Sequence, residues 1–276
     1  MNLQRSPWFK GLVGVVVVLL AAACAPAKPP EAPEVSFTAR SYSFEGPVSV
    51  ASGWTKLTVK IEGQEQHHIQ LVQLDAGKTV DDLVAAMTAQ PVGYPAWARP
   101  DGGPNTPDFG GTASDFVFLD AGSYALICII PGADGVPHFQ KGMAKALTVT
   151  SEKTAGVEPV GDVTISQSDF HFDVSGSLTP GTHMIRIENA GGQQHEAVLV
   201  KLREGATAED YLSAAPGTTP PVAVHLGGIT GILPGESNFV SVDLESGNYA
   251  LYCFLTDPAS GAPHFVLGMM QEFTVP

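Results

Sequence analysis

Residues 122–128 read GSYALIC, and residues 247–253 read GNYALYC. The stretch that follows the first of these, GVPHFQKGM at 135–143, is matched after the second by GAPHFVLGM at 261–269. Self-similarity of this kind indicates that one structural unit occurs twice in the chain.

The repeat extends upstream, where residues 42–74 align without a gap on residues 170–202. Within both copies, short runs alternate apolar and polar residues between glycine, proline and aspartate turns, as at Leu57, Val59 and Ile61. Such runs are typical of the strands of a sandwich or barrel. The fold class is therefore predicted as all-β, with two tandem β-sandwiches.

Each copy also contains one segment with the signature of a helix start. Thr79 is followed three residues later by Asp82, and Thr207 by Asp210, in both cases ahead of apolar residues. One short helical insertion is expected in each sandwich. The stretch 91–115 is rich in proline and glycine and is predicted to be a surface loop.

The predicted order along the chain is a signal peptide, a spacer and two domains. Residues 11–23 form an unbroken apolar stretch, shorter than the ~20 residues that a membrane-spanning helix needs but suited to a signal peptide. The expected boundaries are 1–23 for the signal, 24–35 for a proline-rich linker, 36–150 for the first domain, 151–160 for a second linker and 161–276 for the second domain.

The apolar stretch ends in Leu20-Ala21-Ala22-Ala23-Cys24, which resembles a bacterial lipoprotein signal. That pattern prefers leucine three positions before the cysteine, where this chain has Ala21. The resemblance implies that Cys24 becomes the lipidated first residue of an exported protein, anchored to a membrane and facing the periplasm or the cell exterior. An ordinary cleaved signal, or an uncleaved anchor with an incidental cysteine, is the alternative.

Both copies carry the same four side chains with metal-binding chemistry, in the same order. The set in the first copy is His67, Cys128, His138 and Met143, and the set in the second is His195, Cys253, His264 and Met269. Two imidazoles, a thiolate and a thioether suit copper in both oxidation states, and a His2Cys site with a weak axial Met is the blue-copper arrangement. A structural zinc site would instead want four strong ligands.

On these residues each copy resembles a cupredoxin, the blue copper family of plastocyanin and azurin. The resemblance implies a Greek-key sandwich and up to two type 1 copper ions per chain, held by the four side chains of each copy. The nine residues 129–137 between Cys128 and His138 exceed the usual family spacing, and a similar long loop occurs in copper nitrite reductase.

Plain packing is the alternative for any one of these side chains, since lone buried Cys, His and Met are usually core residues. The retention of all four types in both copies argues against it. Exported proteins also rarely keep unpaired thiols, and Cys128 and Cys253 lie in separate domains. The register assigns His67 rather than His68 as the ligand, because His67 falls on His195. His171, His183 and His225 lack counterparts and are interpreted as surface or packing residues.

The charge balance restricts the partners. The chain has 14 Lys and Arg against 28 Asp and Glu, a net charge of −14. Nucleic acids are therefore excluded as partners, and the lipid anchor is expected to be the only contact with a membrane. The acidic second domain suggests a basic redox partner protein such as a cytochrome.

The preferred function is single-electron transfer through type 1 copper. The alternatives are copper storage or delivery, or a metal-free scaffold. A nitrite-reductase-like enzyme is disfavoured, because the neighbours of Cys128 are Ile127 and Ile129 and those of Cys253 are Tyr252 and Phe254. Related enzymes place there a histidine that binds a further copper. The chain is therefore expected not to be an enzyme.

Overall fold

A computed structural model of the chain describes residue 1 and residues 31–90, 93–215 and 218–276. Cys24 and the expected signal peptide lie outside the described residues. None of the helices within the described ranges is long and apolar enough to cross a membrane.

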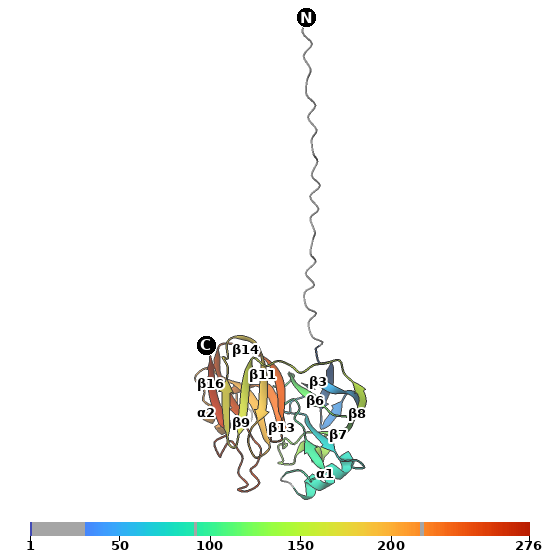
Figure 1. The fold of residues 1–276 in the computed structure, drawn as a ribbon. Coiled ribbons are helices and arrows are strands. Elements are labelled where there is room, and N and C mark those ends of the chain that lie inside the picture. The colour runs from blue at the N-terminus through green and yellow to red at the C-terminus, as the bar shows by residue number, and fades with distance from the viewer. Residues whose placement is uncertain (2–30, 91–92, 216–217) are drawn as a thin grey trace.

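The described strands fall into two halves that lie side by side (Figure 1). The first half contains β1 (Glu34–Arg40), β2 (Ser43–Glu45), β3 (Ser49–Ile61), β4 (Gln70–Leu74), β5 (Ala98–Pro100), β6 (Thr112–Leu119), β7 (Gly122–Ile127) and β8 (Ala144–Lys153). The second contains β9 (Val163–Ser168), β10 (His171–Ser175), β11 (Gly181–Asn189), β12 (His195–Leu202), β13 (Ala223–Ile232), β14 (Ser237–Leu244), β15 (Gly247–Tyr252) and β16 (Met270–Val275).

Each half is a two-layered β-sandwich. In the second half one layer has the order β10-β9-β11-β14 and the other the order β13-β12-β15-β16. The first half repeats this arrangement, with β3 long enough to pair with β6 in one layer and with β8 in the other. Successive side chains of a strand point to opposite faces, so every second side chain of β6 and β9 is buried in the space between the layers.

Each sandwich has its own hydrophobic core, as expected from the repeat. Leu57, Val59 and Ile61 are fully buried in the first core, and Ile185 and Ile187 occupy the matching places in the second. The prediction of an all-β fold with two tandem sandwiches is confirmed.

The two short helices lie where the capping signals predicted them. Helix α1 (Val80–Ala89) begins after Thr79, and α2 (Ala208–Ser213) begins after Thr207. Both carry a complete capping box, in which the threonine oxygen accepts from the backbone N–H three residues later and the aspartate accepts from the threonine N–H. These contacts satisfy N–H groups that have no partner inside the helix. Within the described residues, the 3-10 turn η1 (His138–Lys141) follows β7 in the first half.

Two strands extend beyond the expected domain boundaries. Strand β1 begins at Glu34, inside the expected linker 24–35, and β8 continues to Lys153, inside the expected linker 151–160. The extension of β8 has a clear cause, since it pairs with the first residues of β3 as far as Ser52.

The expectation of a surface loop at 91–115 is wrong for most of that segment. Residues 98–100 form β5, and residues 102–108 run antiparallel to β13 of the other half through backbone hydrogen bonds such as Asn105 N–H to Gly228 O at 3.0 Å. The neighbouring side chains Asn105 and Thr106 are buried. The prolines and glycines of this segment therefore form a buried extended segment between the halves.

Gly103 and its repeat equivalent Gly228 in β13 show why glycine is needed where this segment passes the other half. Both have a positive φ, and a Cβ would lie 2.3 Å from Ile69 O at Gly103 and 1.9 Å from Ala197 O at Gly228. Glycine is required where two backbones approach so closely.

Equivalent positions of the two repeats meet at this contact. Pro104 forms an isolated bridge with Ile229, which occupies the equivalent position in the second repeat. The outer layers also meet, where Phe116 of β6 pairs with Phe239 of β14. A buried carboxylate, Asp115, accepts hydrogen bonds from Gly103 N–H at 2.8 Å and from Asn238 Nδ2 at 2.6 Å across the same boundary.

Candidate metal centres

Within the described residues, two groups of side chains have the geometry of a metal site, and each gathers three of the predicted ligands. In the first half the donor atoms of His67, Cys128 and His138 lie within 4.8 Å of one another. His67 Nδ1 is 3.1 Å from His138 Nδ1, which is 3.5 Å from Cys128 Sγ. All three side chains are buried.

The second half repeats this geometry closely. His195 Nδ1 is 3.1 Å from His264 Nδ1, and His264 Nδ1 is 3.3 Å from Cys253 Sγ. His67 lies just before β4 and His195 begins β12. These strands pair with β7 and β15, which end one residue before Cys128 and Cys253, so strand pairing brings each first histidine close to its cysteine. The same donor set at the same spacing in two independent cores points to one shared chemistry.

The loop after each cysteine is closed by matched backbone hydrogen bonds. Phe139 N–H donates to Cys128 O at 2.9 Å, and Phe265 N–H donates to Cys253 O at 3.0 Å. Isolated bridges between Pro131 and Pro137, and between Thr256 and Pro263, hold the two sides of the longer loops. The long spacing between cysteine and histidine therefore does not prevent the ligands from meeting.

Met143 and Met269 are fully buried in the same core clusters as the two cysteines. Met143 N–H donates to His138 O at 3.0 Å, and Met269 N–H donates to His264 O at 2.9 Å. The tight turn ahead of each methionine uses a glycine with positive φ, Gly142 and Gly268.

Burial sets the protonation states of the donor atoms. It lowers the pKa of His67 to about 4. The lowered pKa favours the neutral imidazole, whose lone pair binds metal. Burial raises the pKa of the Cys128 thiol to about 12 and raises that of Cys253 as well. A metal ion must therefore displace one proton from each thiol when it binds as a thiolate complex.

Backbone N–H groups point at the sulfurs and favour the thiolate. Cys128 is hydrogen-bonded by the backbone of His68 and Ile130, and Cys253 by that of Glu196 and Leu255. The distance from Glu196 N to Cys253 Sγ is 3.5 Å. Hydrogen bonds of this kind outside the ligand set tune a bound metal.

His68 is not part of the cluster, in agreement with the assignment of His67. The His68 ring is buried and accepts a hydrogen bond at Nε2 from Ile129 N–H at 3.1 Å. Glu196, its equivalent in the second half, accepts from Phe254 N–H at 3.0 Å. The residue after each first histidine therefore fixes the backbone beyond each cysteine.

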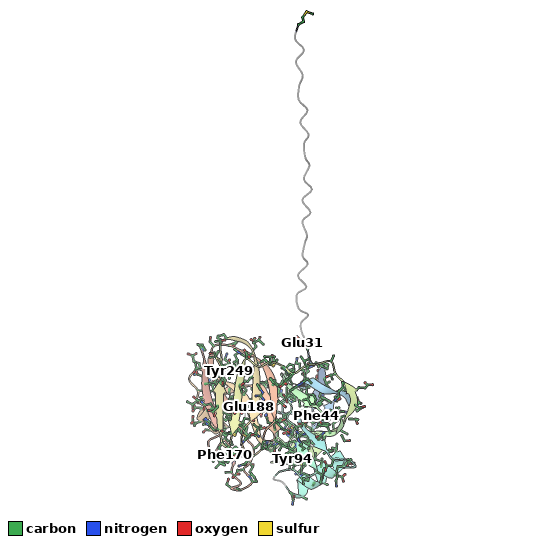
Figure 2. The ribbon with its side chains drawn as sticks, in the orientation of Figure 1. Glu31, Phe44, Tyr94, Phe170, Glu188 and Tyr249 are labelled. Atoms are coloured by element: carbon green, nitrogen blue, oxygen red, sulfur yellow. The ribbon has the colours of Figure 1, made fainter. Side chains whose placement is uncertain are left out.

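An aromatic ring lies against the second histidine of each site. Tyr42 is 5.0 Å from the His138 ring and Phe170 is 5.2 Å from the His264 ring, measured between ring centroids. Tyr42 has φ of 63° and Phe170, labelled in Figure 2, has φ of 65°, both in the left-handed region. A non-glycine residue rarely adopts this conformation, and its cost is typical of functional sites.

The two sites differ in their surroundings. His195 Nε2 lies 3.0 Å from Asp169 Oδ1, which fixes the ring orientation and leaves Nδ1 as the metal-binding atom. The equivalent residue in the first half is Ser41, and there Lys141 instead lies 4.9 Å above the Tyr42 ring. The first site also has a carboxylate nearby, Glu65, whose charge acts on both His67 and His138, so each site has a carboxylate beside it.

The donor chemistry fits copper. Two neutral imidazoles and a thiolate in a buried, close-packed position match the His2Cys set of blue copper, and the thioether buried in the same core is a soft ligand for Cu(I). Without a metal, each pair of facing Nδ1 atoms has to share a single proton in a buried position. A bound cation would satisfy both nitrogens and the sulfur at once.

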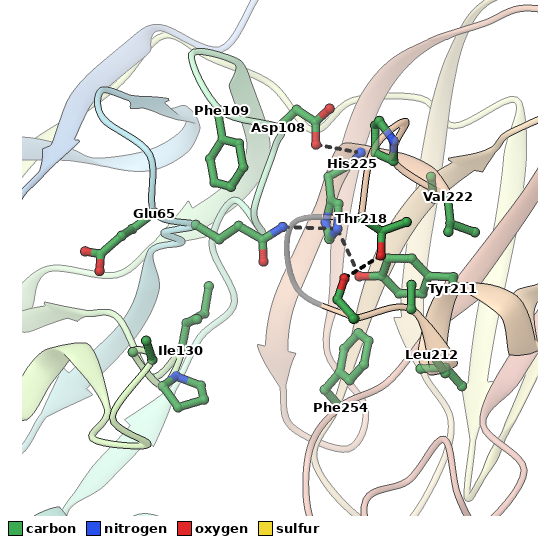
Figure 3. Close-up of a pocket in the computed structure, with 18 of the residues that line it drawn as sticks. Glu65, Asp108, Phe109, Ile130, Tyr211, Leu212, Thr218, Val222, His225 and Phe254 are labelled. Carbon is green, nitrogen blue, oxygen red and sulfur yellow. Dashed lines mark hydrogen bonds between the residues drawn. The ribbon is translucent and has the colours of Figure 1, made fainter.

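Each second histidine also lines a pocket at the boundary between the halves. His138 lines a pocket of about 560 Å³ together with Glu65 and Ile130 from its own half and Tyr211, His225 and Phe254 from the other (Figure 3). Figure 3 shows the His225 ring within this pocket, where Nε2 lies 3.1 Å from Gln66 Nε2 and 2.9 Å from the Tyr211 hydroxyl. His264 lines a second pocket of about 460 Å³ with Tyr94 and Ile129 of the first half.

The remaining histidines are placed as expected. His171 is exposed, whereas His183 is buried with Nδ1 2.7 Å from Asp162 Oδ2. His225 packs between the halves. The sequence reasoning missed Asp169, Glu196, Tyr42 and Phe170 as neighbours of the ligands. Only Tyr42 and Phe170, which match in the repeat alignment, gave a signal that could have found them.

The known proteins that are similar to the chain come from the solved structures. No protein-family model and no curated protein sequence matches the chain. Among solved structures, reduced auracyanin from Roseiflexus castenholzii is 26% identical, with 41% of this chain and 94% of that chain covered and a TM-score of 0.29. Copper nitrite reductase from Nitrosomonas europaea is 14% identical over 88% of this chain and 93% of that chain, with a TM-score of 0.26. Blue copper oxidase from Nitrosomonas europaea is 13% identical over 81% and 79%, with a TM-score of 0.25.

These comparisons correct one expectation. The prediction that the chain is not an enzyme is wrong, because copper enzymes are similar to it over 81% to 88% of its length. The low identities and TM-scores assign no particular reaction to the chain. The prediction of two tandem β-sandwiches, each with a His, Cys and His group that can hold copper, is confirmed.

Proposed function

We propose that the protein carries single electrons through two type 1 copper sites, one in each half. The observation that carries the proposal is the repeated His2Cys geometry, with Nδ1 to Nδ1 distances of 3.1 Å in both halves. A copper ion held by these residues would supply the chemistry, since it can change between Cu(I) and Cu(II) by one electron. The two imidazoles, the thiolate and the thioether suit both oxidation states, so little would have to move.

Rigid surroundings support electron transfer. The ligands lie at strand ends or in loops closed by backbone hydrogen bonds, and the side chains are buried in closely packed cores. The edge of His138 reaches the larger pocket, where a donor or acceptor would come closest to the first site. A basic redox partner such as a cytochrome fits the acidic net charge of −14.

The test is the visible spectrum of the full chain loaded with Cu(II). We expect two coppers per chain and an intense thiolate-to-copper absorption that bleaches on reduction and returns on oxidation. A colourless protein that still binds Cu(I) would instead support storage or delivery. A chain that binds no copper would leave a metal-free scaffold.

Met143 and Met269 are proposed as the axial ligands. Met269→Leu should raise the reduction potential of the second site by about 60 mV, a tenfold change in the preference for Cu(I), because a weak donor to Cu(II) is lost. Met143→Leu is the matched control and should act on the first site alone. A redox titration that finds both potentials unchanged in both variants contradicts the axial assignment.

We also propose that the protein is exported and anchored through a lipid on Cys24. The support is the sequence Leu20-Ala21-Ala22-Ala23-Cys24 after an apolar stretch. The mass of the N-terminal peptide of the mature protein tests the anchor. An unmodified cysteine in that peptide, or an uncleaved signal, contradicts it.

A copper oxidoreductase acting on a small molecule is a second candidate. The pocket favours it, because it places Glu65, Tyr211 and His225 beside the ligand His138. The copper-loaded protein, supplied with an excess of an electron donor and with nitrite or oxygen, would show steady turnover if this candidate holds. A single reoxidation of each copper without turnover would favour electron transfer alone.

A further inference from the structure

A chain of buried polar groups leads from the cysteine of the first half towards the other half. Ile129, the residue after Cys128, donates its N–H to His68 Nε2 at 3.1 Å. The backbone of His68 is itself hydrogen-bonded to the Cys128 sulfur. Because Nε2 accepts, the ring proton is on Nδ1, which leaves that atom as a donor.

The second half contains the equivalent arrangement around Cys253. Phe254, the residue after Cys253, donates its N–H to Glu196 Oε1 at 3.0 Å, and Glu196 N–H donates to Cys253 Sγ at 3.5 Å. Glu196 therefore contacts the thiol through its backbone and the peptide beyond the thiol through its side chain.

Asn105 joins the two arrangements across the boundary between the halves. Its Nδ2 donates to Glu196 Oε2 at 3.2 Å, and its side chain is also hydrogen-bonded to His68. The exposed fractions are 3% for His68, 1% for Asn105 and 4% for Glu196. The contacts are thus continuous from one cysteine to the other and shielded from water.

Packing of the two halves alone does not require three buried polar side chains at their boundary. Burying an imidazole, an amide and a carboxyl is costly unless each is paired, and an apolar interface would avoid that cost. Electronic coupling also decays more slowly through covalent and hydrogen bonds than across gaps between packed side chains. A water-free hydrogen-bonded chain between two ligand peptides is therefore suited to carry an electron.

We propose that His68, Asn105 and Glu196 form an internal electron route between the two copper sites, an inference that rests on the function proposed above. One electron leaves the reduced site, which is oxidised from Cu(I) to Cu(II). It reaches the oxidised site in the other half, which is reduced from Cu(II) to Cu(I). No bond is broken, and no proton has to be exchanged with solvent. An electron received at either pocket is thereby shared by both sites.

The structure supplies a matched control for this route. Thr230 occupies the position in the second repeat that Asn105 occupies in the first, since Gly102 and Gly103 fall on Gly227 and Gly228. Thr230 is fully buried at the same boundary, and its hydroxyl donates to Ile69 O at 3.1 Å. Neither this contact nor its 3.2 Å contact with Gly103 O involves His68 or Glu196.

The experiment follows redistribution of one electron in the copper-loaded full chain. The parent carries Met269→Leu, so that the two sites differ in potential and in spectrum. A pulse of a small radical reductant delivers less than one electron per chain, and absorption with freeze-quench EPR then follows each Cu(II) site. We expect a phase whose rate is independent of protein concentration in the parent. Asn105→Ala should slow this phase about tenfold, and Thr230→Val should leave it within about twofold of the parent.

Asn105→Thr is the second variant. It introduces the residue that the other half already accommodates at this position, and its short side chain cannot reach both partners. Amide hydrogen exchange of Ile129 and Phe254 in the metal-free variants provides a readout independent of copper. Retained protection there establishes that His68 and Glu196 still hold the two peptides.

The outcomes separate the two proposals. A parent without thiolate-to-copper absorption overturns the proposed function. A parent with two coloured sites but only concentration-dependent redistribution overturns the internal route and leaves the proposed function standing. Equal rates in the parent and in both Asn105 variants, or equal slowing in Thr230→Val, also overturn the route.

Discussion

Cys128→Ser should remove about half of the thiolate-to-copper absorption and one of the two coppers per chain. The serine hydroxyl keeps its proton at neutral pH and offers a hard oxygen in place of a soft sulfur. It therefore gives neither the same affinity for Cu(I) nor a sulfur-to-copper transition. Absorption spectra and copper analysis of the reconstituted protein measure both effects.

Cys253→Ser is the matched variant, because Cys253 has the same burial and the same neighbours in the second half. It should remove the other part of the absorption, and the double variant should be colourless. The ligand assignment is wrong if both single variants keep the full colour. Since the two cores are separate clusters, each single variant should retain the fold of the other half.

Above pH ~6.5, where the histidines are mostly neutral in the folded and the unfolded chain alike, the stability of the metal-free protein should fall as the pH rises to about 8. Burial raises the pKa of Asp115 to about 8, whereas an unfolded aspartate has a pKa of about 3.9. Between these values the folded protein holds a proton that the unfolded chain releases, so each step up in pH favours unfolding. The slope from one such group is at most about 1.4 kcal/mol per pH unit.

Asp115→Asn should remove this part of the slope, because an amide does not titrate and its oxygen can still accept from Gly103 N–H and Asn238 Nδ2. Urea unfolding at several pH values gives the free energy of unfolding for both proteins. Asp243→Asn, on the exposed face of β14, is the control for the loss of one carboxylate. If the variant and the parent keep the same slope, Asp115 is not the group responsible.

The ligands could be predicted from the sequence because both copies retain them in order. His67, Cys128 and His138 come from distant parts of the chain, yet each has a counterpart that the repeat alignment identifies. The helices were predictable for a local reason, since Thr79 and Thr207 each meet an aspartate three residues later. Both signals are independent of the way in which the halves pack together.

The contact between the halves was not predictable in the same way. Proline and glycine at 102–107 are typical of a loop, and the close approach of Gly103 to Ile69 O, seen only in the structure, accounts for the glycine in this buried extended segment. Asn105 aligns with Thr230, and Asp169 aligns with Ser41. The alignment therefore shows both only as positions at which the two copies differ. Their roles depend on contacts that a comparison of the two copies cannot supply.

The pairing of Pro104 with Ile229 bears on the origin of the chain. Contact between equivalent positions is the mark of an isologous interface, in which two identical subunits meet across a two-fold axis. The present arrangement is what gene duplication and fusion would produce from a homodimer of single sandwiches. In such an ancestor the two positions now held by Asn105 and Thr230 had to be the same residue. Joining the subunits in one polypeptide allowed asparagine at one and threonine at the other.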